Sequence, residues 1–316
     1  MITDFDDAYT NGAYIPNGSD WPGRWTASAE HFRENLPPGC TATYSTAYGA
    51  GDRNSFDLFR PAGTPKGLAI FIHGGYWMKF MKSDWSHLAE GALRRGWAVA
   101  MPGYTLAPDV TIGGITSEIA RAITAIAAEV DGPIRLAGHS AGGHLATRMI
   151  CEPSQLPETV LERLQQVISI SGLHDLRPLM RTRLNDTLKL TELEARNESP
   201  ALRRPRLTHK VMCWVGAAER PEFIRQTDLL ANVWHGLGVE IDKHHADERH
   251  HFDVIEDLVN PESTLTKLLA MYTYDRMTNG VQSSTIWYRD GVPIYIDTAL
   301  WVGGTGGPAR IIAILP

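Results

Sequence analysis

The sequence lacks the features that would place a protein in a membrane or on a nucleic acid. No apolar run is long enough to span a bilayer, and the first thirty residues hold acids and turn formers instead of the basic start and apolar stretch of a secretory signal. The formal net charge is -6, and no basic stripe is present that could neutralise phosphates. We therefore expect neither a membrane nor a nucleic acid as a partner.

Cysteine is also scarce. The three cysteines, Cys40, Cys151 and Cys213, are odd in number and widely spaced, which is typical of free thiols in a reducing compartment and not of a disulfide framework. This usage predicts a cytoplasmic protein.

The chain does hold enough apolar residues for one large core, since 43% of its 316 residues are hydrophobic. Short apolar runs alternate with amphipathic stretches, an order that predicts an α/β fold with a mostly parallel central sheet and helices on both faces. The first two strands are expected to form an antiparallel pair. The expected strands are 41–48, 56–60, 67–73, 98–103, 134–137, 167–171, 211–216 and 240–244, and the expected helices are 27–35, 83–95, 115–130 and 222–236.

Four regions follow from this pattern. One large α/β domain is expected over residues 1–274, beginning with an N-terminal arm over 1–38. An insertion at about 172–205 is expected to roof the pocket, by analogy with other proteins of this fold. Residues 275–316 form an extension in which 285–296 reads as a β-hairpin around Asp290-Gly291. We expect this extension to pack in order and to associate subunits into a homo-oligomer.

The most informative motif lies at residues 138–142, which read Gly-His-Ser-Ala-Gly. An apolar strand precedes it and an amphipathic helix follows, a context typical of the nucleophile elbow of α/β-hydrolases. Glycines are needed there because the backbone crowds around a serine held on a tight turn. The motif predicts Ser140 as a nucleophile, with the N–H of Ala141 at the start of the helix facing a developing negative charge.

A second glycine motif, residues 73–77, reads His-Gly-Gly-Tyr-Trp and follows a buried strand. Glycines at this point let backbone N–H groups turn toward a pocket, so Gly74 and Gly75 are expected to complete an oxyanion hole with Ala141. The neighbouring aromatic side chains of Tyr76 and Trp77 are expected to form pocket walls, with plain core packing as the alternative.

A serine hydroxyl needs a base, and the base needs an orienting acid. His251 follows the last predicted strand and fits the base, with the adjacent His250 as the competitor. Glu219 fits the acid because it comes first in the loop after the strand at 211–216. Two alternatives stay open for the acid, Glu222 in the same loop and Asp175 after the preceding strand.

Histidines and acids near the last strand could also be read as a metal cluster. Their spacing matches neither a metalloprotease nor a zinc finger, so we expect no metal and no cofactor. His139 and His144 are expected to be packed, hydrogen-bonded histidines and not catalysts. The residues of the cluster are His244, His245, His250, His251, Asp242 and Asp247.

Taken together, the motifs resemble the arylformamidase branch of the α/β-hydrolases, the kynurenine formamidase-like proteins. The resemblance covers about residues 4–274. It is carried by residues 73–77, 82–84, 104, 107–108, 138–145, 171–173, 175–176, 221–223, 225–226 and 251–252.

The resemblance implies Ser140 as nucleophile, His251 as base and an acid at the Glu219 position, where animal relatives carry aspartate. It also implies a metal-free hydrolysis of a small aryl formamide such as N-formylkynurenine, through an acyl-enzyme. Tyr76, Trp77, His139 and Leu173 are the expected substrate contacts. The alternatives are a carboxylesterase or carbamate hydrolase with the same triad, and a catalytically silent scaffold that binds a small molecule.

Overall fold

The computed structural model describes residues 2–206, 208–270, 287–289 and 292–294. The chain divides into two compact units, Met1–Ala270 and Met271–Pro316. No helix of the described residues is both long enough and apolar enough to cross a bilayer.

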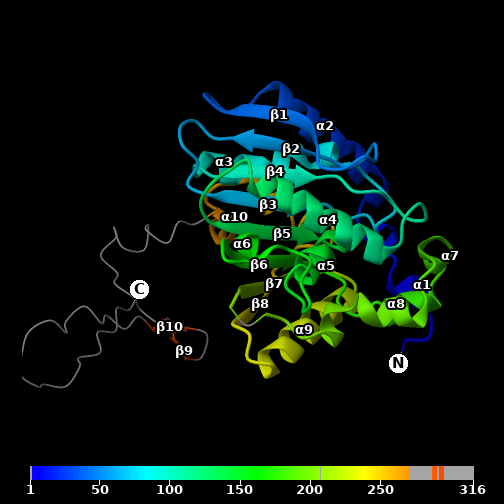
Figure 1. The fold of residues 1–316 in the computed structure, drawn as a ribbon. Coiled ribbons are helices and arrows are strands. Elements are labelled where there is room, and N and C mark those ends of the chain that lie inside the picture. The colour runs from blue at the N-terminus through cyan, green and yellow to red at the C-terminus, as the bar shows by residue number, and fades with distance from the viewer. Residues whose placement is uncertain (1, 207, 271–286, 290–291, 295–316) are drawn as a thin grey trace, which may run out of the picture. The chain divides into compact units, whose positions relative to one another are not determined.

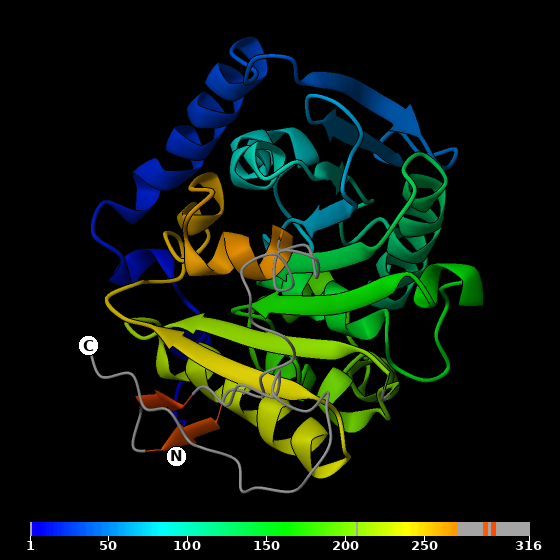
Figure 2. The ribbon, with the colours of Figure 1, turned by 90° about the vertical axis from the view of Figure 1, so that its left-hand side faces the viewer.

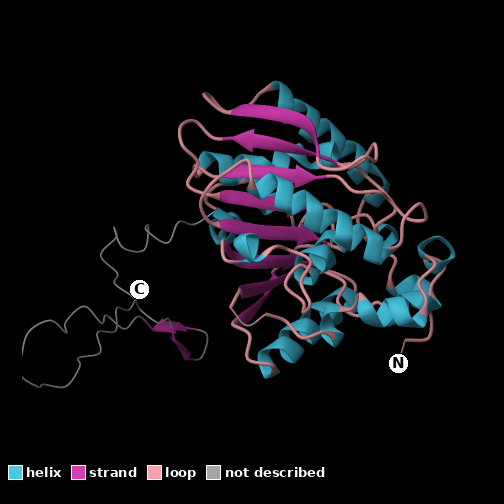
Figure 3. Ribbon diagram, viewed as in Figure 1, coloured by secondary structure: helices cyan, strands magenta, loops and turns pink. Residues whose placement is uncertain are grey.

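The first unit is built on an eight-stranded sheet with the order β1-β2-β4-β3-β5-β6-β7-β8, visible in Figures 1 and 3. The strands from β4 to β8 in this order pair in parallel, whereas β2 is antiparallel to both β1 and β4. The mostly parallel sheet expected from the sequence is therefore confirmed. Its strands are β1 (Thr41–Ala47), β2 (Ser55–Arg60), β3 (Leu68–Ile72), β4 (Ala98–Pro102), β5 (Ile134–His139), β6 (Leu164–Ile170), β7 (Lys210–Gly216) and β8 (Ile241–Ala246).

Helices connect these strands. The α-helices of this unit are α1 (Phe5–Ala8), α2 (Trp21–Glu34), α3 (Glu90–Arg94), α4 (Ile112–Ala127), α5 (Ala141–Arg148), α6 (Glu158–Leu161), α7 (Asn185–Leu188), α8 (Glu192–Asn197), α9 (Pro221–Gly236) and α10 (Thr264–Ala270). The 3-10 helices are η1 (Gly12–Tyr14), η2 (Gly18–Asp20), η3 (Lys82–Ala89), η4 (Arg177–Arg181), η5 (Pro200–Leu202) and η6 (Glu256–Val259).

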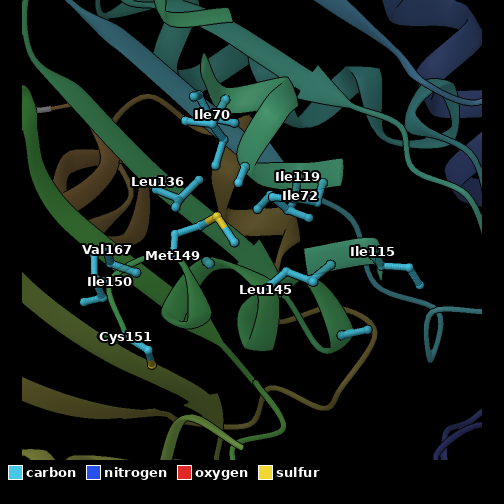
Figure 4. Close-up of a cluster of buried hydrophobic side chains, with 14 of the residues drawn as sticks. Ile70, Ile72, Ile115, Ile119, Leu136, Leu145, Met149, Ile150, Cys151 and Val167 are labelled. Atoms are coloured by element: carbon cyan, nitrogen blue, oxygen red, sulfur yellow. The ribbon is translucent and has the colours of Figure 1, made fainter. Parts of the chain in front are cut away.

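Two hydrophobic clusters lie on opposite faces of the sheet. Strand β3 contributes to both, since Ile70 and Ile72 belong to one cluster and Ala69 and Phe71 to the other. Its sequence is therefore apolar throughout. Figure 4 shows β3, β5 and β6 packing against α4 and α5 in the first cluster. Helices α2, α3 and α10 supply the second, and Figure 2 shows α2 and α4 on opposite sides of the strands. Both faces are covered, as expected for parallel strands.

Three predicted helices have different bounds or types in the structure. The segment expected as one helix over 83–95 is the 3-10 helix η3 followed by the short α3. Tertiary packing accounts for this, because the Trp85 ring packs at a tilt against Trp25 of α2, with ring centroids 4.7 Å apart. Helix α2 starts six residues before the predicted 27–35, and α4 starts at Ile112, where the Thr111 side chain caps the N–H of Gly114 at 3.2 Å.

The predicted insertion over 172–205 contains η4, α7, α8 and η5. Five of its leucines are buried in the larger hydrophobic cluster. The buried ones are Leu173, Leu176, Leu179, Leu188 and Leu190.

In the second unit, β9 (Trp287–Arg289) and β10 (Val292–Ile294) pair antiparallel, with Arg289 opposite Val292. This pairing confirms the predicted hairpin. The remainder of residues 275–316, with the proposed association of subunits, lies outside the described residues.

Candidate active site

Ser140 sits at the junction of β5 and α5, on a strained turn. Its backbone has φ 55° and ψ -117°, a conformation that non-glycine residues adopt only where the surroundings enforce it. The Ser140 N–H donates to the carbonyl of Ile170 on β6 at 2.8 Å, which anchors the turn to the sheet. The serine is thus held at the carboxyl edge of the central strands.

The turn is possible only because glycines surround it. A Cβ on Gly138 would lie 2.1 Å from the carbonyl oxygen of Gly142, and one on Gly142 would lie 2.0 Å from that of Ile72. Both contacts are far inside van der Waals distance. Any side chain at these two positions would therefore push α5 away from β3 and β5, and move Ser140 with it.

The Gly74-Gly75 segment lies against the elbow. A Cβ on Gly74 would lie 3.0 Å from the Cβ of Ser140, and Gly75 has φ +105°, a conformation suited to glycine. Among the described residues, none accepts a hydrogen bond from the N–H of Gly74 or Gly75. The N–H of Ala141 opens α5, where the first N–H groups have no intrahelical partner. These three groups offer the free donors that an oxyanion hole requires.

The predicted base and acid are brought together. The Nδ1 atom of His251 lies 2.6 Å from Oε2 of Glu219, and both side chains are almost fully buried. The second oxygen, Oε1, accepts from the N–H of Gly216 at 2.9 Å and from the hydroxyl of Ser171. The carboxylate is therefore fixed by three donors, and it in turn fixes the orientation of the imidazole.

The two alternative acids have other partners. Both oxygens of Glu222 pair with the guanidinium of Arg225 at 2.8 Å, and Asp175 pairs with Arg177 at 2.8 Å. Neither carboxylate contacts His251 among the contacts of the described residues. The geometry therefore separates Glu219 from its competitors.

The segment that carries His251 also touches the elbow. The ring of His139 packs on the ring of His251 with centroids 4.6 Å apart, and Nε2 of His139 donates to the carbonyl of His251 at 2.9 Å. Burial and the nearby His251 ring lower the pKa of His139 well below its usual value. This histidine is consequently neutral at neutral pH and supports the base without competing with it.

The other histidines of the predicted cluster go to separate surroundings. His244 stacks on Trp214, His245 pairs with Asp228 at 3.0 Å, and His250 packs edge-on against Trp21. Within the described part of the chain, no group of three potential ligands could hold a metal ion. His144 donates to the carbonyl of Glu198 at 2.6 Å and is fully buried, which lowers its pKa to about 3.

Comparison with known proteins places this geometry in a family. The model of the alpha/beta hydrolase family matches residues 69–299. The chain belongs to the α/β-hydrolase family, and it is an α/β-hydrolase-type enzyme.

Curated relatives of this hydrolase include three animal proteins named kynurenine formamidase. The one from Danio rerio is 29% identical over 231 residues, which cover 70% of this chain and 78% of the relative. The one from Drosophila melanogaster is 26% identical over 288 residues, which cover 84% of this chain and 96% of the relative. The resemblance to the kynurenine formamidase-like branch is therefore confirmed.

Solved structures agree on the fold. A protein from Silicibacter sp. tm1040, provisionally described as a thioesterase, is 53% identical with a TM-score of 0.80, covering 84% of this hydrolase and 98% of that chain. Esterase B from Lactobacillus rhamnosis is 18% identical with a TM-score of 0.61, and the match covers 83% of this chain and 95% of the esterase chain. At that identity the likeness shows the fold alone.

The structure corrects two of the expected substrate contacts of this hydrolase. Trp77 and Leu173 have no exposed surface and belong to the main hydrophobic cluster, where Trp77 packs edge-on against His144. Large apolar side chains gain more from the core than from a pocket wall, which explains the difference. Tyr76 is half-buried and donates its hydroxyl to the carbonyl of Tyr9 at 2.5 Å. His139 contacts His251 as described above.

Two contributions were missed at the level of sequence. Ser171 follows β6 directly and has φ 51°, and its hydroxyl holds Glu219. Its position at the carboxyl end of β6, the strand beside β5, could have indicated Ser171 as a site residue. The N-terminal arm also reaches the site, since Tyr9 contacts Tyr76, and the backbone at Gly12 lies near the ring of Phe252. No pattern in the sequence indicates this approach.

Proposed function

We propose that this hydrolase cleaves a small aryl formamide through an acyl-enzyme at Ser140. The observation that carries the chemistry is the His251–Glu219 pair, with Nδ1 and Oε2 2.6 Å apart, next to the strained elbow of Ser140. A histidine oriented in this way through Nδ1 keeps its Nε2 available as a base for a serine hydroxyl.

The reaction follows from these positions. Ser140 Oγ attacks the formyl carbon while His251 takes its proton, and the carbonyl oxygen becomes an oxyanion facing the N–H groups of Gly74, Gly75 and Ala141. The carbon–nitrogen bond then breaks, and His251 gives the proton to the leaving arylamine. Water, deprotonated by the same imidazole, hydrolyses the formyl ester to formate and restores Ser140.

Similarity to three proteins named kynurenine formamidase supports a formamide as the substrate. A second candidate, hydrolysis of an acyl thioester or ester, is favoured by the description of the 53% identical structure as a thioesterase. Both candidates use the same triad, because the bond that is cleaved depends on the shape of the pocket and not on the nucleophile.

A substrate panel separates the two. With N-formylkynurenine, 4-nitrophenyl acetate, an aryl carbamate and an acyl thioester, we expect kcat/KM for the formamide to exceed the others by about tenfold or more. Ser140→Ala serves as the background for every substrate. Faster turnover of the thioester or ester, with no turnover of the formamide, would contradict the substrate and leave the serine chemistry standing.

We also propose that the enzyme works in the cytoplasm. Among the described residues the three cysteines are unpaired, and two of them are buried. Burial raises the pKa of Cys151 to about 11, so this thiol stays protonated and unreactive.

A further inference from the structure

The two glycine N–H groups of the oxyanion hole must be held in one direction by other parts of the chain. Gly74 and Gly75 carry no side chain that could fix them, and a peptide unit between glycines turns over at little cost. The next two residues, Tyr76 and Trp77, have φ 52° and 57°, so this backbone is strained and needs partners to keep its conformation. Among the described residues, no member of the triad forms a hydrogen bond with this segment.

Tyr104, which lies two residues after β4, holds the first carbonyl of the segment. Its side chain is fully buried, and its hydroxyl donates to the carbonyl of His73 at 3.0 Å. Burial raises the pKa of this phenol, so the hydroxyl keeps the proton that it donates. The Tyr104 ring also stacks on the His73 imidazole, with centroids 4.4 Å apart and planes 14° apart.

The His73 side chain holds the second carbonyl. Its Nδ1 atom lies 2.8 Å from the carbonyl oxygen of Gly74. A carbonyl oxygen can only accept a hydrogen bond, so this contact requires the proton of the imidazole to be on Nδ1. Burial lowers the pKa of His73 to about 4, so at neutral pH the ring is neutral and carries this one proton.

These two carbonyls determine where the glycine N–H groups point. The carbonyl of His73 shares a trans peptide unit with the N–H of Gly74, and the carbonyl of Gly74 shares one with the N–H of Gly75. In a planar trans unit the N–H points opposite to the C=O. Strand β3 lies between β4 and β5 (Figure 1). Carbonyls drawn toward Tyr104, on the β4 side, therefore turn both N–H groups toward Ser140, on the β5 side.

Tyr104 is itself fixed relative to the glycine segment. Nε of Arg53 donates to the carbonyl of Tyr104 at 2.9 Å, and the same guanidinium donates to the carbonyl of Phe80. The N–H of Ala107 donates to the carbonyl of Trp77 at 2.9 Å. The loop after β4 and the loop after β3 are thus tied together on both sides of the tyrosine hydroxyl.

We propose that Tyr104, together with His73, is a positioning residue that turns the N–H groups of Gly74 and Gly75 toward the oxyanion. Both side chains act through peptide units and not on the substrate. Because a correctly aimed N–H is worth more in the transition state than in the bound substrate, its loss lowers kcat more than it changes KM. The inference rests on the proposed function only in taking Ser140 as the nucleophile, and it does not depend on a formamide.

Tyr104→Phe tests the hydroxyl alone, because the ring that stacks on His73 is kept. With 4-nitrophenyl acetate we expect kcat to fall about 10- to 100-fold and KM to stay within about threefold of the wild type. The matched control is Tyr48→Phe, because the Tyr48 hydroxyl donates to the carbonyl of Gly103, the residue before Tyr104, at 2.7 Å. This control should keep both constants. Equal kcat in the two variants would overturn the proposal.

Phenylboronic acid gives a readout at the oxyanion itself. Its boron takes up the Ser140 oxygen, the proton passes to His251, and the resulting tetrahedral anion presents an oxygen to the glycine N–H groups. The Ki should rise in Tyr104→Phe by about the factor by which kcat/KM falls, and should stay at the wild-type value in Tyr48→Phe. A lower kcat with an unchanged Ki would contradict a role in aiming these N–H groups.

His73→Asn and His73→Leu separate the hydrogen bond from the volume of the side chain. The two new side chains have nearly the same shape, but only asparagine has an N–H group at about the position of Nδ1. We expect kcat of His73→Asn to exceed that of His73→Leu by about tenfold or more. A kcat for His73→Leu equal to or above that of His73→Asn would show that residue 73 only packs. This pair also carries the test if Tyr104→Phe does not fold.

The same measurements distinguish this proposal from the proposed function. Ester turnover by the wild type, with Tyr104→Phe unaffected, would overturn the positioning role and leave the serine chemistry standing. A wild type that turns over neither ester nor formamide and does not bind phenylboronic acid would overturn both.

Discussion

Ser140→Ala is expected to lower kcat by about 10⁴- to 10⁶-fold while leaving the fold intact. The hydroxyl is the attacking atom, and the free N–H groups around it cannot replace a nucleophile. The loss of one oxygen leaves no sizeable cavity at a side chain that is 3% exposed. Steady-state and pre-steady-state kinetics with an aryl ester give the ratio of kcat between the wild type and Ser140→Ala.

The control for this variant is Ser19→Ala, because Ser19 is exposed and its hydroxyl donates only to the neighbouring Asp20 among the described residues. It should retain full activity, and both variants should melt within a few degrees of the wild type. If Ser140→Ala kept more than about a hundredth of the wild-type rate, Ser140 would not be the nucleophile.

Glu219→Gln is expected to lower kcat by about 10³- to 10⁴-fold. A glutamine at this position presents an NH₂ group or a neutral oxygen to Nδ1 of His251, so the imidazole loses its orientation and its cation loses the partner now 2.6 Å away. The Gly216 N–H can still donate to the amide oxygen, which limits the loss of stability.

Glu222→Gln and Asp175→Asn are the matched controls. Each removes one charge from a buried carboxylate that pairs with arginine, so each should lower the melting temperature. Because neither carboxylate contacts His251, kcat should stay within about tenfold of wild type. A larger rate loss in Asp175→Asn than in Glu219→Gln would place the acid after β6 and contradict this account.

The sequence was most informative where one residue type is physically required. Only glycine fits at 138 and 142, because a Cβ there would lie about 2 Å from a backbone carbonyl oxygen, and so the elbow is readable as a motif. Strand β3 was equally readable, since it is buried on both faces and is apolar throughout.

Helix bounds were less predictable from the sequence, for reasons that the packing explains. The apolar positions Trp21, Trp25, Ala29 and Phe32 follow helical spacing and are buried along α2, yet the predicted helix began only at residue 27. Segment 82–94 is shaped by the packing of Trp85 against Trp25, a contact between residues sixty positions apart that no local window contains.

The candidate site shows the same division. Ser140, His251 and Glu219 have motif or loop signals, and the acid could be ranked by its distance from the end of β7. Tyr9 has none, because it reaches the site only through the path of the N-terminal arm. Trp77 and Leu173 adjoin predicted site motifs but their side chains turn into the core, a choice set by tertiary packing.

The most direct test of the central claim is the site of covalent labelling. The wild-type enzyme, inactivated with a fluorophosphonate and digested, is mapped by mass spectrometry. We predict one adduct per chain on the peptide containing Ser140, and no adduct in Ser140→Ala. Stoichiometric labelling at another residue, or unchanged labelling of Ser140→Ala, would contradict Ser140 as the nucleophile.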